Sequence, residues 1–180
     1  MTIKSDVTAE DQLPLGDIKD HWALARAYEE IDYREAERLS KKDNLASTVV
    51  LIVSAISSVS IFSSLVANSP ATWAKIVVGV MTAAAAIAAL LQKQYAWSTR
   101  SSKFSDCVAR WNMQAGDARD LARRVVDGIP VSSERDGARL GKNEQETMNT
   151  QPPVDVGERD VAVDQQRQEF DKRFGIAPQR

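Results

Sequence analysis

The chain has 180 residues, enough for one ordinary domain and a tail, and its formal net charge at pH 7 is -2. This charge argues against a nucleic-acid-binding protein, because such proteins usually carry a strongly basic face. The single cysteine, Cys107, excludes an internal disulfide, and the single histidine, His21, excludes a histidine-based metal cluster.

Residues 1–16 are predicted to be a flexible N-terminus, and residues 17–43 to form one long helix. Asp17 can cap the start of this helix, and Lys41 and Lys42 near its end complement the helix dipole. No proline or glycine follows before residue 66, so the helix can continue directly into the apolar run that comes next. His21, near the start of the helix, is expected to be a surface histidine.

Two apolar runs, residues 45–66 and 72–91, follow with a short connector between them. Each is close to the roughly 20 apolar helical residues that cross the hydrocarbon core of a bilayer. The alternative is a pair of buried helices in a soluble protein. A chain of this length leaves too little other apolar surface to cover two such helices. The sequence therefore predicts an all-α membrane protein with a two-helix transmembrane hairpin.

Basic residues near the ends of the two runs predict the orientation of the hairpin. They flank the ends away from the connector: Arg34, Arg38, Lys41 and Lys42 before the first run, and Lys93, Arg100, Lys103 and Arg110 after the second. The connector side offers only Lys75. Both termini should therefore be cytoplasmic. Lys75 either snorkels to the outer headgroups, which we favour, or lies at the mouth of an oligomeric pore.

The first run carries a stripe of serines, and the second is rich in alanine. Five serines fall within an arc of about 120° on a helix: Ser47, Ser54, Ser57, Ser58 and Ser64. Small residues let membrane helices approach closely, and serine hydroxyls can bond across the interface. Tight packing within the hairpin explains part of this pattern. The functional alternative is an oligomer in which the stripe lines a polar path.

After the second run, a long helix is predicted to end at Asp127-Gly128-Ile129-Pro130. Its apolar and small residues alternate spacings of four and three, which indicates a coiled-coil seam. The seam consists of Trp97, Ser101, Phe104, Val108, Trp111, Ala115, Ala118, Ala122 and Val125. Its expected partner is the upstream helix running antiparallel beside it, and self-association through the same seam is compatible with this pairing. Cys107 beside the seam is expected to be a small buried hydrophobe.

Residues 129–180 are predicted to be a polar, mostly disordered tail, because they offer little apolar area to offset the entropy of ordering. A short amphipathic helix over residues 161–174 is possible within it. Residues 17–128 then form the two-transmembrane helical domain. The chain shows no glycine-rich phosphate loop, no paired cysteines and no catalytic constellation, so neither an enzyme nor a cofactor is expected.

Two stretches, YREAERLSKKDNLAS and LLQKQYAWSTRSSKFSDCVARWNMQAGDARDLA, resemble the SLATT domain over roughly residues 20–128. SLATT domains are bacterial two-transmembrane effectors associated with nucleotide-second-messenger and other conflict systems. The resemblance rests on the architecture and on a diffuse pattern of aromatic, basic and small residues. It offers no catalytic residue to carry over.

The resemblance implies a homo-oligomer in the bacterial inner membrane that permeabilises the bilayer and halts or kills the cell in antiviral defence. The trigger would come from a nucleotide-second-messenger synthase or sensor encoded nearby, since the chain has no room for a nucleotide-binding domain. The alternative function is a non-enzymatic anchor or scaffold that presents a coiled-coil stalk to cytosolic partners.

Overall fold

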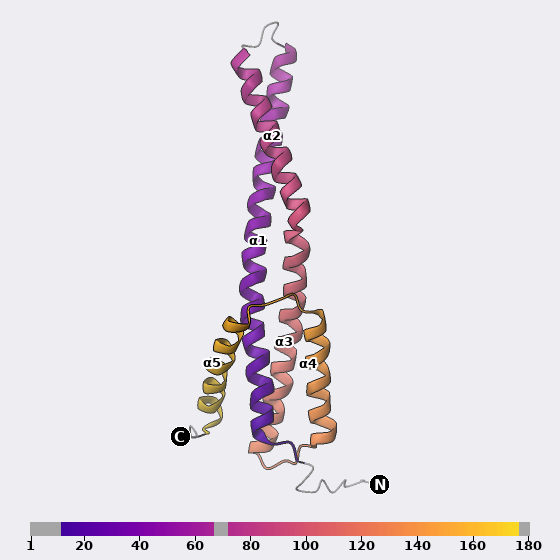
Figure 1. Cartoon of the computed structure of the whole chain (residues 1–180), viewed down its shortest axis with the longest axis vertical. Coiled ribbons are helices and arrows are strands. Elements are labelled where there is room, and N and C mark those ends of the chain that lie inside the picture. The colour runs from indigo at the N-terminus through magenta and orange to yellow at the C-terminus, as the bar shows by residue number, and fades with distance from the viewer. Residues whose placement is uncertain (1–11, 67–71, 177–180) are drawn as a thin grey trace. The chain divides into compact units, whose positions relative to one another are not determined.

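The structure is a computed structural model that describes residues 12–66 and 72–176. Within these ranges it describes only the backbone of residues 57–66, 72–75, 77–78, 92 and 94. The described residues form helices joined by short connections and no β-sheet, which confirms the all-α class (Figure 1). In chain order they are α1 (Leu15–Val66), α2 (Thr72–Tyr95), α3 (Trp97–Val126), the π-helical turn η2 (Ser133–Gly137), α4 (Ala138–Thr150) and α5 (Val156–Phe174).

The chain divides into two compact units, residues 1–35 with 103–180 and residues 36–102. We call the described part of the first unit the bundle (residues 12–35 and 103–176). The described part of the second unit is called the hairpin (residues 36–66 and 72–102). Helix α1 runs through both units without interruption, as the absence of proline and glycine predicts.

The hairpin contains one break that the sequence does not predict, at Ala96 between α2 and α3. Ala96 has φ 44°, in the left-handed region that disfavours residues with a Cβ. The Arg100 N–H donates to the Ala96 carbonyl at 2.9 Å, so α3 starts directly at the break. On either side of it, the rings of Tyr95 and Trp97 stack with centroids 5.6 Å apart.

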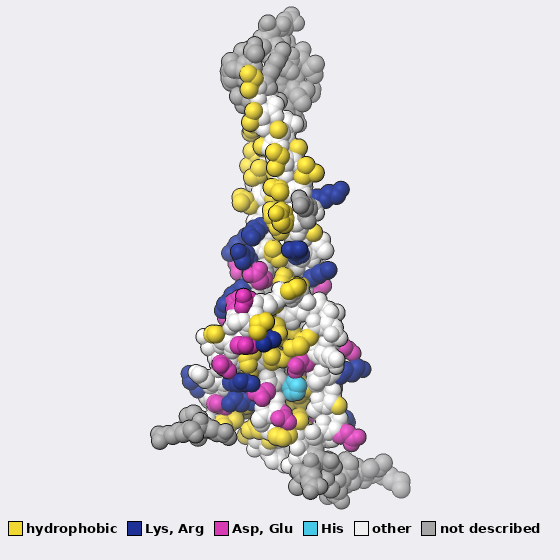
Figure 2. Space-filling model, viewed as in Figure 1, with side chains coloured by type: hydrophobic (Ala, Val, Ile, Leu, Met, Phe, Trp, Pro, Cys, Tyr) yellow, Lys and Arg dark blue, Asp and Glu magenta, His cyan; other side chains and the backbone are white. Residues whose placement is uncertain are grey.

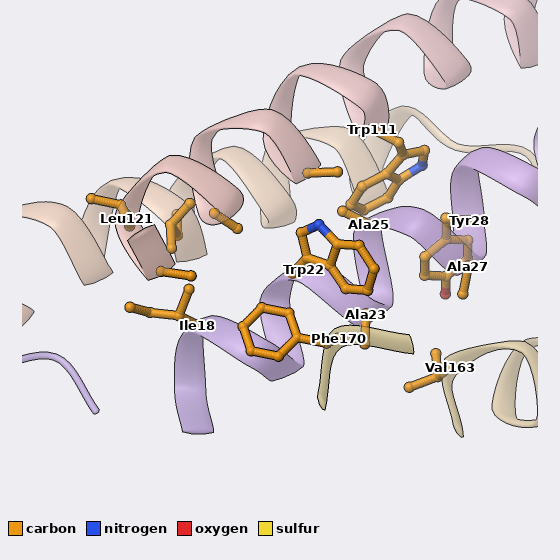
Figure 3. Packing of buried hydrophobic residues seen from close by; sticks show 14 of the residues in the cluster. Ile18, Trp22, Ala23, Ala25, Ala27, Tyr28, Trp111, Leu121, Val163 and Phe170 are labelled. Carbon is orange, nitrogen blue, oxygen red and sulfur yellow. The ribbon is translucent and has the colours of Figure 1, made fainter. Parts of the chain in front are cut away.

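The core of the bundle is built on the predicted pairing of α1 with α3. Tyr28 of α1 stacks on Trp111 of α3, with ring centroids 4.9 Å apart and planes 10° from parallel. Figure 3 shows the same two helices meeting again at Ile18 and Leu121, as expected for antiparallel partners. The buried cluster also contains Trp22, Ala25, Cys107, Ala115, Ala118 and Ala122.

The tail differs from the predicted disordered segment, because residues 138–150 and 156–174 form α4 and α5. Each helix buries two side chains seven residues apart, which places both on one face. These side chains are Leu140 and Thr147 on α4, and Val163 and Phe170 on α5. A few apolar residues at this spacing are enough here, because the α1–α3 pair supplies the apolar surface that covers them.

Local signals fix both ends of α5, which begins five residues before the predicted short helix at 161–174. The Asp155 carboxylate accepts hydrogen bonds from the N–H groups of Gly157 and Glu158 at 2.8 and 3.2 Å, forming an N-cap. At the other end Gly175 has φ 66°, the left-handed conformation in which glycine commonly ends helices.

Part of the segment predicted to be a flexible N-terminus is held in the bundle. Leu13 is buried, and its N–H donates to the carbonyl of Val131 at 2.9 Å. Residues 1–11 lie outside the described residues. The flexible segment predicted at 1–16 is therefore not free at its C-terminal end.

Candidate functional site

Both helices of the hairpin expose large apolar side chains, which gather on the part of its visible face that the structure describes (Figure 2). Leu51 of α1 is 70% exposed and Leu90 of α2 is 66% exposed. The others are Leu45, Val49, Ile52 and Ile56 on α1, and Ile76, Val80, Ile87 and Leu91 on α2. A contiguous apolar surface of this kind marks contact with a membrane or another protein.

Charged residues are absent from most of this surface and gather at its base. No Asp, Glu, Lys or Arg occurs from Asn44 to Ala74, and only Lys75 occurs before Lys93. Next to the apolar stretch, Lys41, Lys42, Lys93 and Arg100 are all exposed. The hairpin therefore changes from an apolar to a basic surface along its length.

No helix offers, within the described residues, a stretch both long enough and apolar enough to cross a membrane. Much of the two predicted spans, including the side chains of residues 57–66 and 72–75, lies outside the described residues.

The structure describes only part of the predicted serine stripe. Ser47 is half-buried and Ser54 is exposed, and neither is without an interaction partner. The side chains of Ser57, Ser58 and Ser64, and that of the predicted pore-mouth residue Lys75, lie outside the described residues. A polar path along this stripe therefore stays a prediction.

The predicted seam of α3 is largely inside the bundle. Its buried members are Phe104, Trp111, Ala115, Ala118 and Ala122, whereas Val108 and Val125 are half-buried. In the hairpin, Trp97 is half-buried, and Ser101 Oγ donates to the Ala36 carbonyl at 2.9 Å. Within the bundle the seam faces the chain's own helices, so it is already occupied.

Gln114, which the heptad pattern does not single out, joins α3 to α4. It is buried, and its Nε2 donates to Thr147 Oγ1 at 2.6 Å and to the Asn143 carbonyl at 2.9 Å. An amide at this position satisfies a buried hydroxyl and a partly buried carbonyl together. It fixes α4 in one register against α3.

The most unusual polar group of the bundle is the carboxyl of Asp32, which sequence reasoning missed. Asp32 is fully buried, at 0% exposure, on the face of α1 that meets α3. Gln151, in the connector between α4 and α5, donates from Nε2 to Asp32 Oδ1 at 3.1 Å. Asp32 Oδ2 and the indole N–H of buried Trp111 lack a hydrogen bond of standard geometry. A buried carboxyl satisfied at one oxygen is costly when it is ionised.

Burial raises the pKa of Asp32 to about 7, while Gln151 and the nearby indole N–H of Trp111 act in the opposite direction. Among the described residues Asp32 has no ion-pair partner that could offset the burial of its charge. The Asp32 carboxyl therefore changes charge near neutral pH, which an ordinary aspartate does not do.

Cys107 of α3 lies beside this carboxyl and is 3% exposed. Burial raises the pKa of the Cys107 thiol, and the negative charge of Asp32 adds to that effect. Thr150, the last residue of α4, lies close enough to contribute a hydrogen bond to the thiol. As the sequence predicts, Cys107 is a buried small side chain, and it has a high-pKa thiol rather than a reactive thiolate.

His21 lies at the surface of the bundle, as expected, but it has a partner that the sequence does not predict. It is partly buried, and its Nδ1 lies 2.5 Å from Glu144 Oε2 of α4. The hydrogen bond with Glu144 raises the pKa of the His21 imidazole, and burial opposes this only in part. His21 therefore helps to dock α4 on α1.

Two neighbouring glutamates, Glu29 and Glu30, line a cavity of about 220 Å³ together with Tyr33 of α1, Val108 of α3 and Gln166 of α5. Arg26 pairs with Glu29 at 2.5 Å, and Arg34 pairs with Glu30. These charges are matched within α1, so the cavity offers no free carboxylate pair. Among the residues that the structure describes, no group of three metal-ligating side chains lies together.

Comparison of the chain with models of protein families, with curated proteins and with solved structures finds no match.

Proposed function

We propose that this chain is an integral membrane protein in which the hairpin crosses the bilayer and the bundle lies in the bacterial cytoplasm. The observation that carries the proposal is the apolar surface of the hairpin. Ten large aliphatic side chains are exposed on two adjacent helices, and all basic residues of the hairpin except Lys75 lie at one end. Exposed basic residues at that end favour an orientation with both termini on the cytoplasmic side.

The cost of leaving this surface in water supports a membrane location. Burying one large aliphatic side chain stabilises a protein by about 1.5–3 kcal/mol, so ten half-exposed ones represent on the order of 10 kcal/mol. The total stability of an ordinary domain is about 5–15 kcal/mol. A bilayer removes this cost without any partner protein, whereas a soluble chain would need another protein surface to cover these side chains.

Within this membrane proposal, we favour an effector that oligomerises and permeabilises the inner membrane on a signal from a partner sensor. The support is the resemblance to SLATT domains, the serine stripe and the small residues of the second apolar run. A scaffold that presents its α3 seam to partners is the second candidate. It is less favoured, because Trp111 at the centre of that seam is 0% exposed and already stacks on Tyr28.

Placing arginine at the middle of both apolar runs should abolish membrane insertion. Arginine at the centre of a membrane helix costs about 3 kcal/mol, so Ile56→Arg with Val80→Arg should cost about 6 kcal/mol. The measurement is the fraction of the chain that stays in the membrane pellet after an alkaline carbonate wash. The matched control is Met113→Arg with Val126→Arg, two exposed positions of the bundle. A wild-type chain found in the supernatant would contradict the membrane proposal.

A voltage-sensitive dye in cells that express the chain with its neighbouring genes separates effector from scaffold. The effector should depolarise the cells. The triple variant Ser54→Leu, Ser57→Leu, Ser58→Leu should insert equally well and depolarise them much less, because the polar path has lost its hydroxyls. Equal depolarisation by both chains would mean that the serine stripe does not line the conducting path. An unchanged membrane potential in cells with abundant inserted wild-type protein would favour the scaffold.

A further inference from the structure

The connector between α4 and α5 is a short strap across the α1–α3 pair (Figure 1). It contains Gln151, two prolines and Asp155. Proline has no N–H to donate, so the strap forms few backbone hydrogen bonds. The Gln151 N–H bonds only back to Met148 of α4 at 3.3 Å, whereas its side chain reaches Asp32, 119 residues away in the sequence.

Burial favours the uncharged form of the Asp32 carboxyl, and the two N–H donors beside it oppose this effect only in part. Helix α3 contributes Cys107 and the Trp111 indole, and the strap contributes the Gln151 amide. Tyr28 of α1 stacks on the Trp111 ring and lies close to Arg159 of α5. Beyond Cys107, α3 carries Arg110 and Asp106, whose opposite charges act on the thiol. No described side chain forms an ion pair with Asp32, so its negative charge would remain buried and uncompensated.

We propose that Asp32 and Gln151 form a proton-dependent latch. With Asp32 protonated, the strap and the last turn of α4 stay closed over α3. When the carboxyl releases its proton to water, the carboxylate is solvated by lifting the strap, and Cys107 becomes accessible beneath Thr150. The inference concerns the bundle alone, so it holds or fails independently of the membrane proposal.

The opening is local, because the rest of the tail has separate anchors. Helix α4 is held by Gln114 on Thr147 and by Glu144 on His21. Helix α5 is held by Phe170, whose ring centroid lies 5.4 Å from that of Trp22, and by an ion pair between Lys19 and Asp171 at 2.7 Å. The strap between these anchors can therefore open while the bundle stays folded. Native proteins commonly open in such local units.

Cys107 is the only thiol of the chain and so reports directly on the latch. The test is the rate of N-ethylmaleimide labelling of the full chain in detergent micelles, divided at each pH by the rate for the urea-unfolded chain. If the open carboxyl has its ordinary pKa, the open fraction should rise about tenfold between pH 6 and pH 8. The division removes the ordinary pH dependence of the thiol itself.

Two variants and one control decide the outcome. Asp32→Asn keeps an oxygen acceptor for Gln151 but cannot ionise, so its normalised labelling rate should stay low and flat with pH. Gln151→Ala should label faster than wild type already at pH 6, while Gln145→Ala, at an exposed position of α4, should match wild type. A flat wild-type profile, or an equal rise in Asp32→Asn, would overturn the latch.

A second measurement needs no variant. Amide hydrogen exchange of the wild-type chain, corrected for its intrinsic pH dependence, should show extra opening at pH 8 confined to residues 149–155. Protection of α3 around Trp111 should not change with it. Uniform loss of protection over the whole bundle would contradict a local latch.

Discussion

Truncating Trp111 to alanine should lower the free energy of unfolding of the bundle by about 3–5 kcal/mol. Trp111 is 0% exposed and stacks on Tyr28, so the variant loses both buried area and an aromatic pair. Because a domain has only about 5–15 kcal/mol in total, the bundle should come close to unfolding at room temperature. The measurement is urea unfolding of the full chain in micelles, followed by far-UV circular dichroism.

Two control variants separate the loss of the ring from other effects. Trp111→Phe keeps a ring against Tyr28 and should recover more than half of the lost stability. Met113→Ala, two residues away at a position that is 65% exposed, should change the stability by less than about 0.5 kcal/mol. A loss below 1 kcal/mol in Trp111→Ala would mean that α1 and α3 are not held together at this stack.

The long helices could be predicted because their signals are local. Residues 17–66 contain neither proline nor glycine, and α1 is continuous over them. Spacings of four and three place Phe104 and Trp111 on the buried face of α3. The end of α3 before Asp127-Gly128 also follows from a local signal. Gly128 has φ 74°, the left-handed conformation in which glycine commonly ends helices.

The tail could not be predicted in this way, because its order depends on residues far away in the sequence. Helices α4 and α5 are polar on average, and each buries only two side chains. What orders them is contact with the α1–α3 pair, as in Phe170 against Trp22 and Thr147 against Gln114. An argument from composition counts only the apolar area that a segment can bury within itself. It therefore misses the apolar surface that the rest of the chain provides.

The buried carboxyl of Asp32 was missed for a related reason. In the sequence Asp32 lies among charged residues, between Glu29 and Arg34, and reads as part of a solvated face. In three dimensions it points to α3, and the strap from residue 151 covers it. The same holds for His21, whose partner Glu144 is 123 residues away. The candidate sites of the bundle arise from pairings that no spacing rule encodes.

Replacing Asp32 with asparagine should make the bundle more stable at pH 8 and leave its stability unchanged near pH 4. The folded state holds the Asp32 proton up to a pKa of about 7, whereas the unfolded chain releases it near the ordinary value of 3.8. The unfolded state therefore loses its proton first, and wild-type stability falls as the pH rises from about 4 to about 7. Above pH 7 both states are ionised, and the penalty stays constant.

The size of the effect follows from the same pKa values. Each unit of pKa difference corresponds to about 1.4 kcal/mol, so the penalty at pH 8 reaches up to about 4 kcal/mol. Urea unfolding of wild type and Asp32→Asn at pH 4.5, 6 and 8 measures it, with Asp120→Asn as the control. The side chain of Asp120 is 68% exposed, so this control should follow the wild-type profile within about 0.5 kcal/mol.

Two outcomes separate the global penalty from the local latch. If the latch opens at high pH, the carboxylate is solvated in the open form, and the gain of Asp32→Asn at pH 8 falls below the full penalty. The difference then equals RT ln(1 + K), where K is the ratio of open to closed chains at pH 8, which the labelling of Cys107 measures independently. Parallel pH profiles of wild type and Asp32→Asn would instead mean that Asp32 is ionised in the folded chain at pH 6. Water must then reach the carboxylate, and the strap cannot be a closed cover at neutral pH.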